Sequence, residues 1–295
     1  MNYILTTENL TKIYGQKKAA NNINIHIREG SIYGLIGRNG AGKTTVMRMI
    51  SGLSKPTGGS YQMHGEHRFG VGVLIESPGI YPNMSAEENL RLKCIAMGCY
   101  KKDYVQQLLS IVGLSDTGKK HAGSFSLGMR QRLGIALALV GDPKMIVLDE
   151  PINGLDPQGI MEVREMILRL NKEKGITILI SSHILDELSR LATHYGFVER
   201  GRVIKEMSAE ELEAACRTAV HLSVNDTKLL AGVLDGMGAE YRIYSPNEAD
   251  IFSPVQVTPL VLALNEKNCF VNSMTERHES LESYFMGLVG GVRNV

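Results

Sequence analysis

The sequence contains few cysteines, little net charge and no long apolar run. Its four cysteines, Cys94, Cys99, Cys216 and Cys269, are scattered among 295 residues without the spacing of a zinc site. We interpret them as reduced thiols of a cytosolic protein, and we expect no secretory leader at the start of the chain. These shortages argue against a disulfide-stapled secreted scaffold and against a structural zinc protein.

The apolar runs are too short to span a membrane. The longest candidate, from Leu133 to Val140, is far shorter than the roughly 20 residues that a transmembrane helix needs. We therefore expect that the chain does not cross a membrane by itself. Its net charge of +1, without a long cationic run, also argues against a nucleic-acid-binding protein.

What the sequence does contain is typical of a folded globular protein. Its residues are 43% hydrophobic and 21% charged, and 295 residues are enough for a full α/β core and a smaller second unit. We predict a nucleotide-binding domain over residues 1–216, with a helical part over about 78–143. Residues 217–295, which alternate short strand-like and helical stretches, are predicted to form a separate α+β domain.

The most informative stretch runs from Gly37 to Thr45 and matches the phosphate-binding loop pattern G-x-x-x-x-G-K-[ST]. A short apolar strand precedes it at residues 31–36, and a helix opens after it at residues 46–50. The glycines allow a tight turn whose N–H groups face phosphate oxygens, and the start of the following helix favours the same anion. Lys43 is expected to reach the β- and γ-phosphates, and the Thr44 hydroxyl to ligate Mg²⁺. The residues predicted to contact the nucleotide in this loop are Gly37, Asn39, Gly40, Ala41, Gly42, Lys43, Thr44 and Thr45.

A second chemical element follows the apolar strand at residues 145–148. Asp149 and Glu150 come at its carboxyl end, which lies beside the phosphate-binding loop in this class of sheet. Two adjacent carboxylates near phosphates need separate roles. Asp149 is predicted to hold Mg²⁺, and Glu150 to polarise the water that attacks the γ-phosphate.

The pattern around these motifs predicts a mixed architecture. Isoleucines at 23, 25 and 27 alternate with polar residues and indicate a small antiparallel unit. Residues 176–180 form another apolar strand, as expected for a parallel sheet buried on both faces. The stretch from Ser85 to Gly141 is helical in pattern and begins with a capping box, and residues 196–204 suggest a closing hairpin.

At this point the chain resembles the ATPase subunits of ATP-binding-cassette (ABC) transporters over about residues 3–205. The diagnostic stretch is Phe125-Ser126-Leu127-Gly128-Met129-Arg130-Gln131-Arg132, which corresponds to the family signature L-S-G-G-Q. The resemblance implies an α/β fold: a P-loop NTPase cassette with a mostly parallel core sheet, an antiparallel β subdomain and a helical subdomain. The small C-terminal α+β domain is additional to it.

The resemblance also implies that a second copy completes the site. Ser126 and Gly128 would meet the γ-phosphate of ATP held by the partner, in a head-to-tail homodimer that forms on ATP binding. Leu127 and Met129 depart from the signature, and any hydrogen bond from position 129 is therefore in doubt. Asp156 belongs to the loop that contacts the opposite subunit in the family.

Three further positions carry roles implied by the family. Tyr14 matches the aromatic residue that stacks on adenine, although a packing role in a strand is the alternative. His183 matches the histidine that touches the γ-phosphate. Glu76 stands where the family has a glutamine that contacts Mg²⁺, and we expect it to ligate the metal and gate coupling, although a carboxylate cannot donate as an amide does.

Glu76 and its surroundings are similar to the bacitracin-resistance and lantibiotic-immunity branch of the family. That branch is bacterial and works with integral membrane subunits at the cytoplasmic face of the membrane to expel peptide antibiotics. Alternatives are the ATPase of a different exporter or of an importer, a non-transport regulatory module, and an ATPase that remodels nucleic acid or ribosomes. The last lacks support because the chain has no coiled-coil insert, paired cassette or basic arm. The cargo is not encoded in these residues.

Overall fold

The computed structural model describes residues 2–65, 70–216, 218–278 and 280–290. The chain divides into two compact units, Met1–Ala209 and Glu210–Val295, and each has its own sheet and hydrophobic core. The assignment of domains to residues 1–216 and 217–295 stays a prediction, and residues 217 and 291–295 lie outside the described part of the chain.

A six-stranded sheet in the order β10-β9-β4-β8-β7-β6 forms the centre of the first unit. Five strands are parallel, and β10 closes the edge in an antiparallel hairpin with β9. All residues of β4, β7 and β8 are buried, as expected for strands covered on both faces of the sheet. The strands are β4 (Ile32–Ile36), β6 (Gly72–Leu74), β7 (Met145–Asp149), β8 (Thr177–Ser181), β9 (His194–Glu199) and β10 (Arg202–Ser208).

An antiparallel sheet precedes the parallel core, as the alternating isoleucines predict. Its strands are β1 (Tyr3–Tyr14), β2 (Lys17–Ile23), β3 (His26–Arg28) and β5 (Gly58–Met63), with β1 paired to the other three. The apolar side chains of this sheet pack with those of the helix after the phosphate-binding loop and with β7, in one core cluster. That packing fixes the loop between the two sheets.

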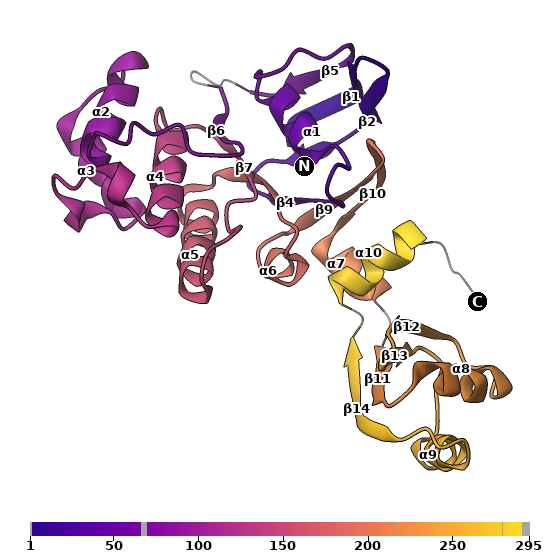
Figure 1. Ribbon diagram of the computed structural model, residues 1–295. Coiled ribbons are helices and arrows are strands. Elements are labelled where there is room, and N and C mark those ends of the chain that lie inside the picture. Colours follow the sequence, from indigo (N-terminus) through magenta and orange to yellow (C-terminus); the bar gives the residue numbers. More distant parts are fainter. Residues whose placement is uncertain (1, 66–69, 217, 279, 291–295) are drawn as a thin grey trace. The chain divides into compact units, whose positions relative to one another are not determined.

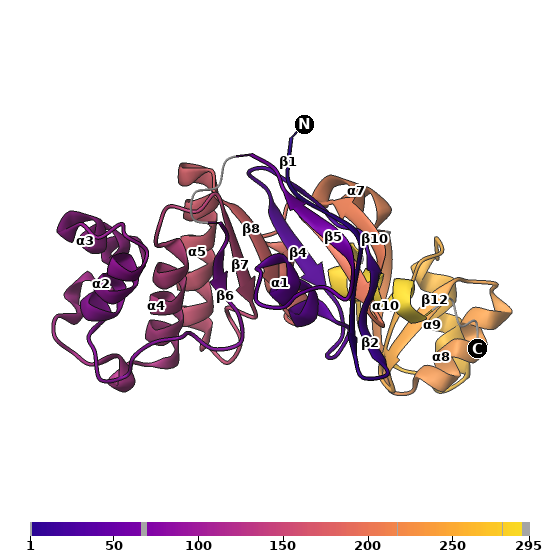
Figure 2. The same ribbon diagram turned by 90° about the horizontal axis from the view of Figure 1, so that it is seen from above.

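The helices of the first unit form two groups. Helices α2 (Ala86–Ala96), α3 (Lys102–Ile111) and α4 (Leu127–Leu139) gather beside the β6 edge of the parallel sheet, away from β1, β2 and β5 (Figures 1 and 2). Helices α1 (Lys43–Ile50), α5 (Pro157–Lys174) and α6 (Leu185–Ser189) follow strands of the sheet itself. Short 3₁₀ turns lie at Ser115–Thr117 and Ala122–Ser124.

Local sequence explains where these helices begin and end. Ser85 and Glu88 form a reciprocal capping box at the start of α2, as the sequence predicts. Asp156 caps α5, Pro157 occupies its first turn, and Gly175 ends it in a left-handed conformation. No helix in the described ranges is both long and apolar enough to cross a membrane.

The second unit is a four-stranded antiparallel sheet with helices packed against it. The strand order is β12-β13-β11-β14, with β11 (Thr218–Val224), β12 (Tyr241–Ser245), β13 (Glu248–Ile251) and β14 (Val271–His278). Its helices are α7 (Ala209–Ala215), α8 (Thr227–Gly236), α9 (Val257–Glu266) and α10 (Leu281–Gly290). Buried leucines of α8 and α9 pack with residues of β11 and β13 in a separate core cluster.

A buried polar network anchors α10 inside this unit. The Asp250 carboxylate is fully buried, and it lies 2.8 Å from His221 Nδ1 and accepts a hydrogen bond of 2.8 Å from the Tyr244 hydroxyl. The same hydroxyl lies 2.6 Å from Ser283 Oγ of α10, to which the Arg242 guanidinium also donates. Three strands therefore share one hydrogen-bonded chain that ends on the last helix.

Candidate functional site

The phosphate-binding loop connects β4 to α1 and is shaped by the two sheets that surround it. Gly42 adopts φ of 109°, and a Cβ at that position would lie 2.3 Å from the carbonyl oxygen of Ala19. Only glycine satisfies both conditions. The loop is tied to the hairpin of the parallel sheet by a hydrogen bond of 2.8 Å from Gly201 N to Ala41 O. Asn39 and Gly40 remain exposed, and Thr45 is half-buried.

Lys43 lies buried across this loop. Its ammonium group donates to the carbonyl oxygen of Gly37 at 2.7 Å. Burial lowers the pKa of Lys43, because a charge in a poorly hydrated site is disfavoured, and the nearby carboxylates of Glu150 and Asp149 oppose that change. The two carboxylates thus favour a charged ammonium group at this buried position, and such a cation is suited to bind the negative charge of a phosphate.

Thr44 and Asp149 meet directly beneath the loop. The Thr44 hydroxyl donates to Asp149 Oδ2 at 2.8 Å, and the Ser181 hydroxyl donates to Oδ1 at 2.6 Å. Because each hydroxyl uses its proton on the carboxylate, the Thr44 oxygen keeps its lone pairs for a cation. One hydroxyl and one carboxylate match the sparse protein ligation of Mg²⁺, which takes its other ligands from phosphates and water. No cluster of three or more acidic, histidine or cysteine side chains that suits a metal occurs among the described residues.

Glu150 and His183 face each other at the same edge of the sheet. Glu150 Oε2 lies 2.6 Å from His183 Nδ1 and accepts a hydrogen bond of 3.2 Å from His183 N. The backbone of Glu150 is left-handed, with φ of 52°, and its N–H donates to Ser181 Oγ at 3.0 Å. The strained turn and two hydrogen bonds from one residue therefore fix the direction of this carboxylate.

Glu76, the remaining acidic residue predicted to reach the metal, is engaged elsewhere. Its Oε1 accepts a hydrogen bond of 2.6 Å from the Arg48 guanidinium, and 60% of its side chain is exposed. Arg48 belongs to α1, one helical turn after Thr44. A metal-ligating role for Glu76 stays a prediction, and in this structure it requires the carboxylate to leave Arg48 or to bind both.

Tyr14 ends the first strand with an exposed ring. Its side chain is accessible at the edge of the antiparallel sheet, and the Lys12 ammonium lies 5.2 Å from the ring centroid. An exposed aromatic face next to a cation can stack on a planar base. The alternative of a buried packing residue does not fit this exposure.

Ser126, Gly128 and Asp156 form a second group. Ser126 caps α4 by accepting a hydrogen bond of 3.2 Å from Met129 N, and Asp156 Oδ1 accepts one of 3.0 Å from Gly159 N. The start of α4 lies close to the loop before α5, because a Cβ added to Gly128 would lie 3.8 Å from Leu155 Cδ2. The hydrogen bonds of Ser126 and Asp156 among the described residues stay within their own helix starts, and their predicted role toward a nucleotide of the partner stays a prediction.

Two residues that matter to this site were absent from the predicted set. Ser181 is the last residue of β8, directly beside Asp149 in the sheet register, and its hydroxyl connects the Asp149 carboxylate to the backbone N–H of Glu150. Its position at the end of a neighbouring parallel strand was a usable signal. Arg48 carried no such signal, because an arginine on a helix is normally a solvated residue.

Comparisons with known proteins agree with this geometry. A sequence profile of the family described as "ABC transporter" matches residues 20–153. The bacitracin transport ATP-binding protein BcrA of Bacillus licheniformis is 40% identical, over 99% of this chain and 99% of that protein. The lantibiotic transport ATP-binding protein SrtF of Streptococcus pyogenes is 44% identical, over 69% of this chain and 90% of that protein.

Solved structures of ATP-binding cassettes share this fold. The ADP conformation of MJ1267, described as an ATP-binding cassette of an ABC transporter, has a TM-score of 0.63 and 30% identity, over 72% of this chain and 93% of that one. A dimeric post-hydrolysis state of the cassette MJ0796, bound to ADP and Pi, has a TM-score of 0.63 and 25% identity, over 70% of this chain and 98% of that one.

Proposed function

The chain belongs to the family of ABC transporter ATP-binding proteins, and on that premise we propose that it powers a bacterial transporter that exports, or gives immunity to, peptide antibiotics. It is an ATPase of the P-loop α/β fold, as the sequence predicted. The observation that supports the cargo class is the match to a bacitracin transport protein along almost the whole chain, the second unit included. A shared cassette alone would not distinguish this cargo from others.

The chemistry follows from the site. Tyr14 stacks on the adenine, the loop from Gly37 to Thr45 surrounds the phosphates, and Lys43 neutralises the β- and γ-phosphates. Thr44 and Asp149 would hold Mg²⁺, which supplies charge stabilisation to the phosphates when bound. The described contacts of Glu150 use Oε2, and Oε1 is therefore the oxygen that takes the proton from the attacking water.

His183 has a specific requirement in this scheme. Its Nδ1 donates to the Glu150 carboxylate, because an ionised carboxylate only accepts hydrogen bonds. A neutral ring would then have an acceptor at Nε2 and would repel a phosphate oxygen. The ring can donate to Glu150 and to the γ-phosphate together only when both of its nitrogens carry a proton.

Dimerisation couples this chemistry to transport. We propose a head-to-tail homodimer in which Ser126, Gly128 and the Asp156 loop of one copy complete the nucleotide site of the other. ATP favours the closed dimer over the open form, and hydrolysis assisted by Glu150 releases it. The chain then acts at the cytoplasmic face of the membrane through separate integral membrane subunits, and it binds no nucleic acid.

The first experiment tests ATP binding and turnover in the purified chain. ATP at about 100 times its Kd should stabilise the protein by about 2.7 kcal/mol in thermal unfolding. Lys43→Ala should lose both this stabilisation and ATP hydrolysis, while Lys205→Ala, on β10, is the matched control that should keep them. If Lys43→Ala binds and hydrolyses ATP as the parent does, the proposed site is wrong.

The second experiment tests the cargo class. A sensitive bacterium that expresses the chain with its membrane subunits should tolerate more bacitracin or more of a lantibiotic than one that expresses the Lys43→Ala variant. Normal ATPase activity with unchanged tolerance of both antibiotics would overturn the cargo class and leave the ATPase assignment intact.

A further inference from the structure

Helix α2 ends in a turn that places two cysteines together. The N–H of Cys99 donates to the carbonyl of Cys94 at 2.9 Å, and the N–H of Gly98 donates to the carbonyl of Ile95 at 3.0 Å. Gly98 has a left-handed backbone with φ of 66°. These features define a Schellman turn, in which the side chains at the positions of Cys94 and Cys99 normally contact each other.

The two thiols differ in exposure, and the Cys99 thiol affects the pKa of Cys94. The Cys94 side chain is fully buried, whereas Cys99 is partly exposed. The pKa of Cys94 is raised to about 12, first because the thiol is buried and then because of the charge and hydrogen bonding of the Cys99 thiol and the charge of Asp142. Both thiols are free in this structure, with Cys99 partly exposed and Cys94 buried.

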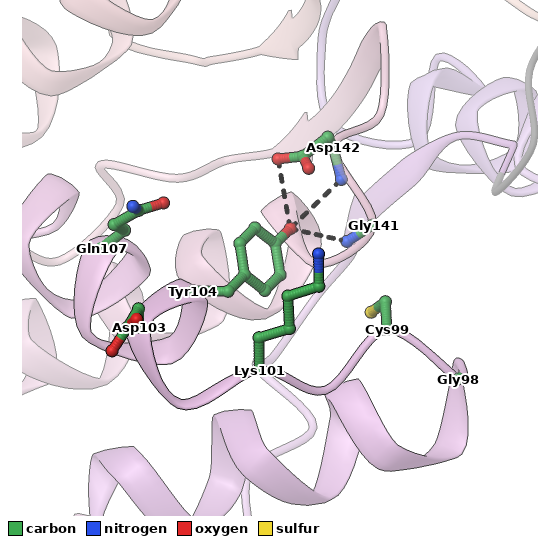
Figure 3. Close-up of a pocket in the computed structure, with 8 residues that line it drawn as sticks. All are labelled: Gly98, Cys99, Lys101, Asp103, Tyr104, Gln107, Gly141 and Asp142. Carbon is green, nitrogen blue, oxygen red and sulfur yellow. Dashed lines mark hydrogen bonds between the residues drawn. The ribbon is translucent and has the colours of Figure 1, made fainter.

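The accessible thiol lines a surface pocket of about 500 Å³. Figure 3 shows Cys99 on the link before α3, with Lys101 and Tyr104 also lining the pocket. The Tyr104 hydroxyl accepts a hydrogen bond of 2.9 Å from Gly141 N and lies 3.2 Å from a carboxylate oxygen of Asp142, just after the end of α4. The pocket is wide enough for a small molecule, and its charged lining consists of the Lys101 ammonium and the carboxylates of Asp103 and Asp142.

We propose that Cys94 and Cys99 form a reversible redox site, which a low-molecular-weight disulfide converts to an intramolecular disulfide. The proposal rests on the turn, the pocket and the contact of the two thiols, and it does not depend on the cargo class. Disulfides in cytosolic proteins are usually transient and redox-sensing, which fits a pair that is reduced at rest.

The chemistry balances in two exchanges. The Cys99 thiolate attacks one sulfur of the small disulfide, a Cys99 mixed disulfide forms, and the first small thiolate leaves and takes up a proton. Cys94 then loses its proton to solvent and attacks the Cys99 sulfur, and the second small thiolate leaves and is protonated. Two protein thiols are oxidised, and one small disulfide is reduced to two small thiols.

The test uses the full chain with Cys216→Ser and Cys269→Ser, so that only the proposed pair can react. After incubation with oxidised glutathione, both remaining thiols should be lost, and the mass should fall by two hydrogen atoms with no glutathione attached. A reductant should restore both thiols. Cys94→Ser in this background should instead keep glutathione on Cys99, because the second exchange is then blocked.

A backbone variant tests whether disulfide formation depends on the geometry of the turn and not only on the presence of two cysteines. Gly98→Val adds a side chain that meets open space but strains the left-handed backbone, and it should slow ring closure by about fivefold or more. Closure as fast as in the parent would overturn the proposal. Persistent glutathione on Cys99 despite Cys94, or two thiols that survive the oxidant, would overturn it as well.

Discussion

Two neighbouring parallel strands, β6 and β7, are each followed by a glutamate with a left-handed backbone. The partner of one glutamate is an arginine, and the partner of the other is a histidine. Leu74 pairs with Leu148 in the sheet register, and Glu76 and Glu150 each follow two residues later. Their φ angles are 63° and 52°. The sheet thus presents two carboxylates in equivalent turns at one edge.

The partners decide what each carboxylate can do. Glu150 is bound by the backbone and ring of His183 and is 23% exposed, whereas Glu76 is 60% exposed and bound by Arg48. A guanidinium is permanently charged and compensates a carboxylate, while an imidazole can give up its proton. We therefore expect the same turn to present a proton acceptor at the end of β7 and a charge-compensated carboxylate at the end of β6.

The largest expected difference lies between the two amide variants. Glu150→Gln should keep ATP binding and lower the rate of hydrolysis by about 10²-fold or more, because it removes the proton acceptor. It should also accumulate an ATP-bound dimer, measurable by size-exclusion chromatography. Glu76→Gln is the matched control and should hydrolyse ATP within about tenfold of the parent. Equal losses in both variants would contradict the division of roles.

His183→Ala should have the second largest effect. Loss of the ring leaves Glu150 without its 2.6 Å partner and removes a donor to the γ-phosphate, so that hydrolysis should fall by about 10–100-fold with ATP affinity little changed. Single-turnover kinetics with a separate binding assay measures this. A change in ATP affinity without a change in the hydrolysis rate would show that His183 binds nucleotide but does not orient Glu150.

Ser181→Ala tests what makes the β7 end rigid. The buried Ser181 hydroxyl donates to Asp149 and accepts from Glu150 N, and the variant leaves both groups without this partner. We expect a loss of about 1–3 kcal/mol in the free energy of unfolding, measured by urea denaturation. Ser182→Ala, whose hydroxyl bonds within its own turn, should lose less.

The smallest expected effect belongs to the exposed ion pair. Arg48→Gln should change the Mg²⁺ concentration needed for tight ATP binding by about threefold, because exposed pairs contribute about 0.2–1 kcal/mol. Nucleotide binding can be followed by fluorescence without turnover. In a Glu76→Gln background the same substitution should have no effect. Additive effects of the two substitutions would mean that Arg48 does not act through Glu76.

The sequence predicted the nucleotide loop with its strand and helix because these choices are local. Buried apolar strands, a capping box and a fixed glycine pattern each constrain neighbouring residues in the chain. The antiparallel unit was also predicted, but the alternating isoleucines do not form one strand: Ile23 ends β2, Ile25 lies in the link, and Ile27 belongs to β3. Asn22 has a left-handed backbone, and β2 and β3 pair with different segments of β1, which alternation cannot reveal.

Strand β13 was not predicted because its inward residues are not all apolar. Asp250 reads as a turn residue in sequence, yet it is fully buried between His221 and Tyr244. Ser181 and Arg48 were also missed. Each is a polar residue whose hydrogen-bond partner lies far away in the chain. The structural role of such a polar residue depends on partners that become neighbours only in the folded protein, so its own sequence context does not indicate that role.

The network on Ser283 sets a limit on how far the protein can be shortened. A chain cut before α10 would leave the Tyr244 hydroxyl and the Arg242 guanidinium without the serine that they share, and would open the buried Asp250 to solvent. The final helix is thus needed to complete the polar network of its unit. Tags or fusions at this terminus should be attached after α10.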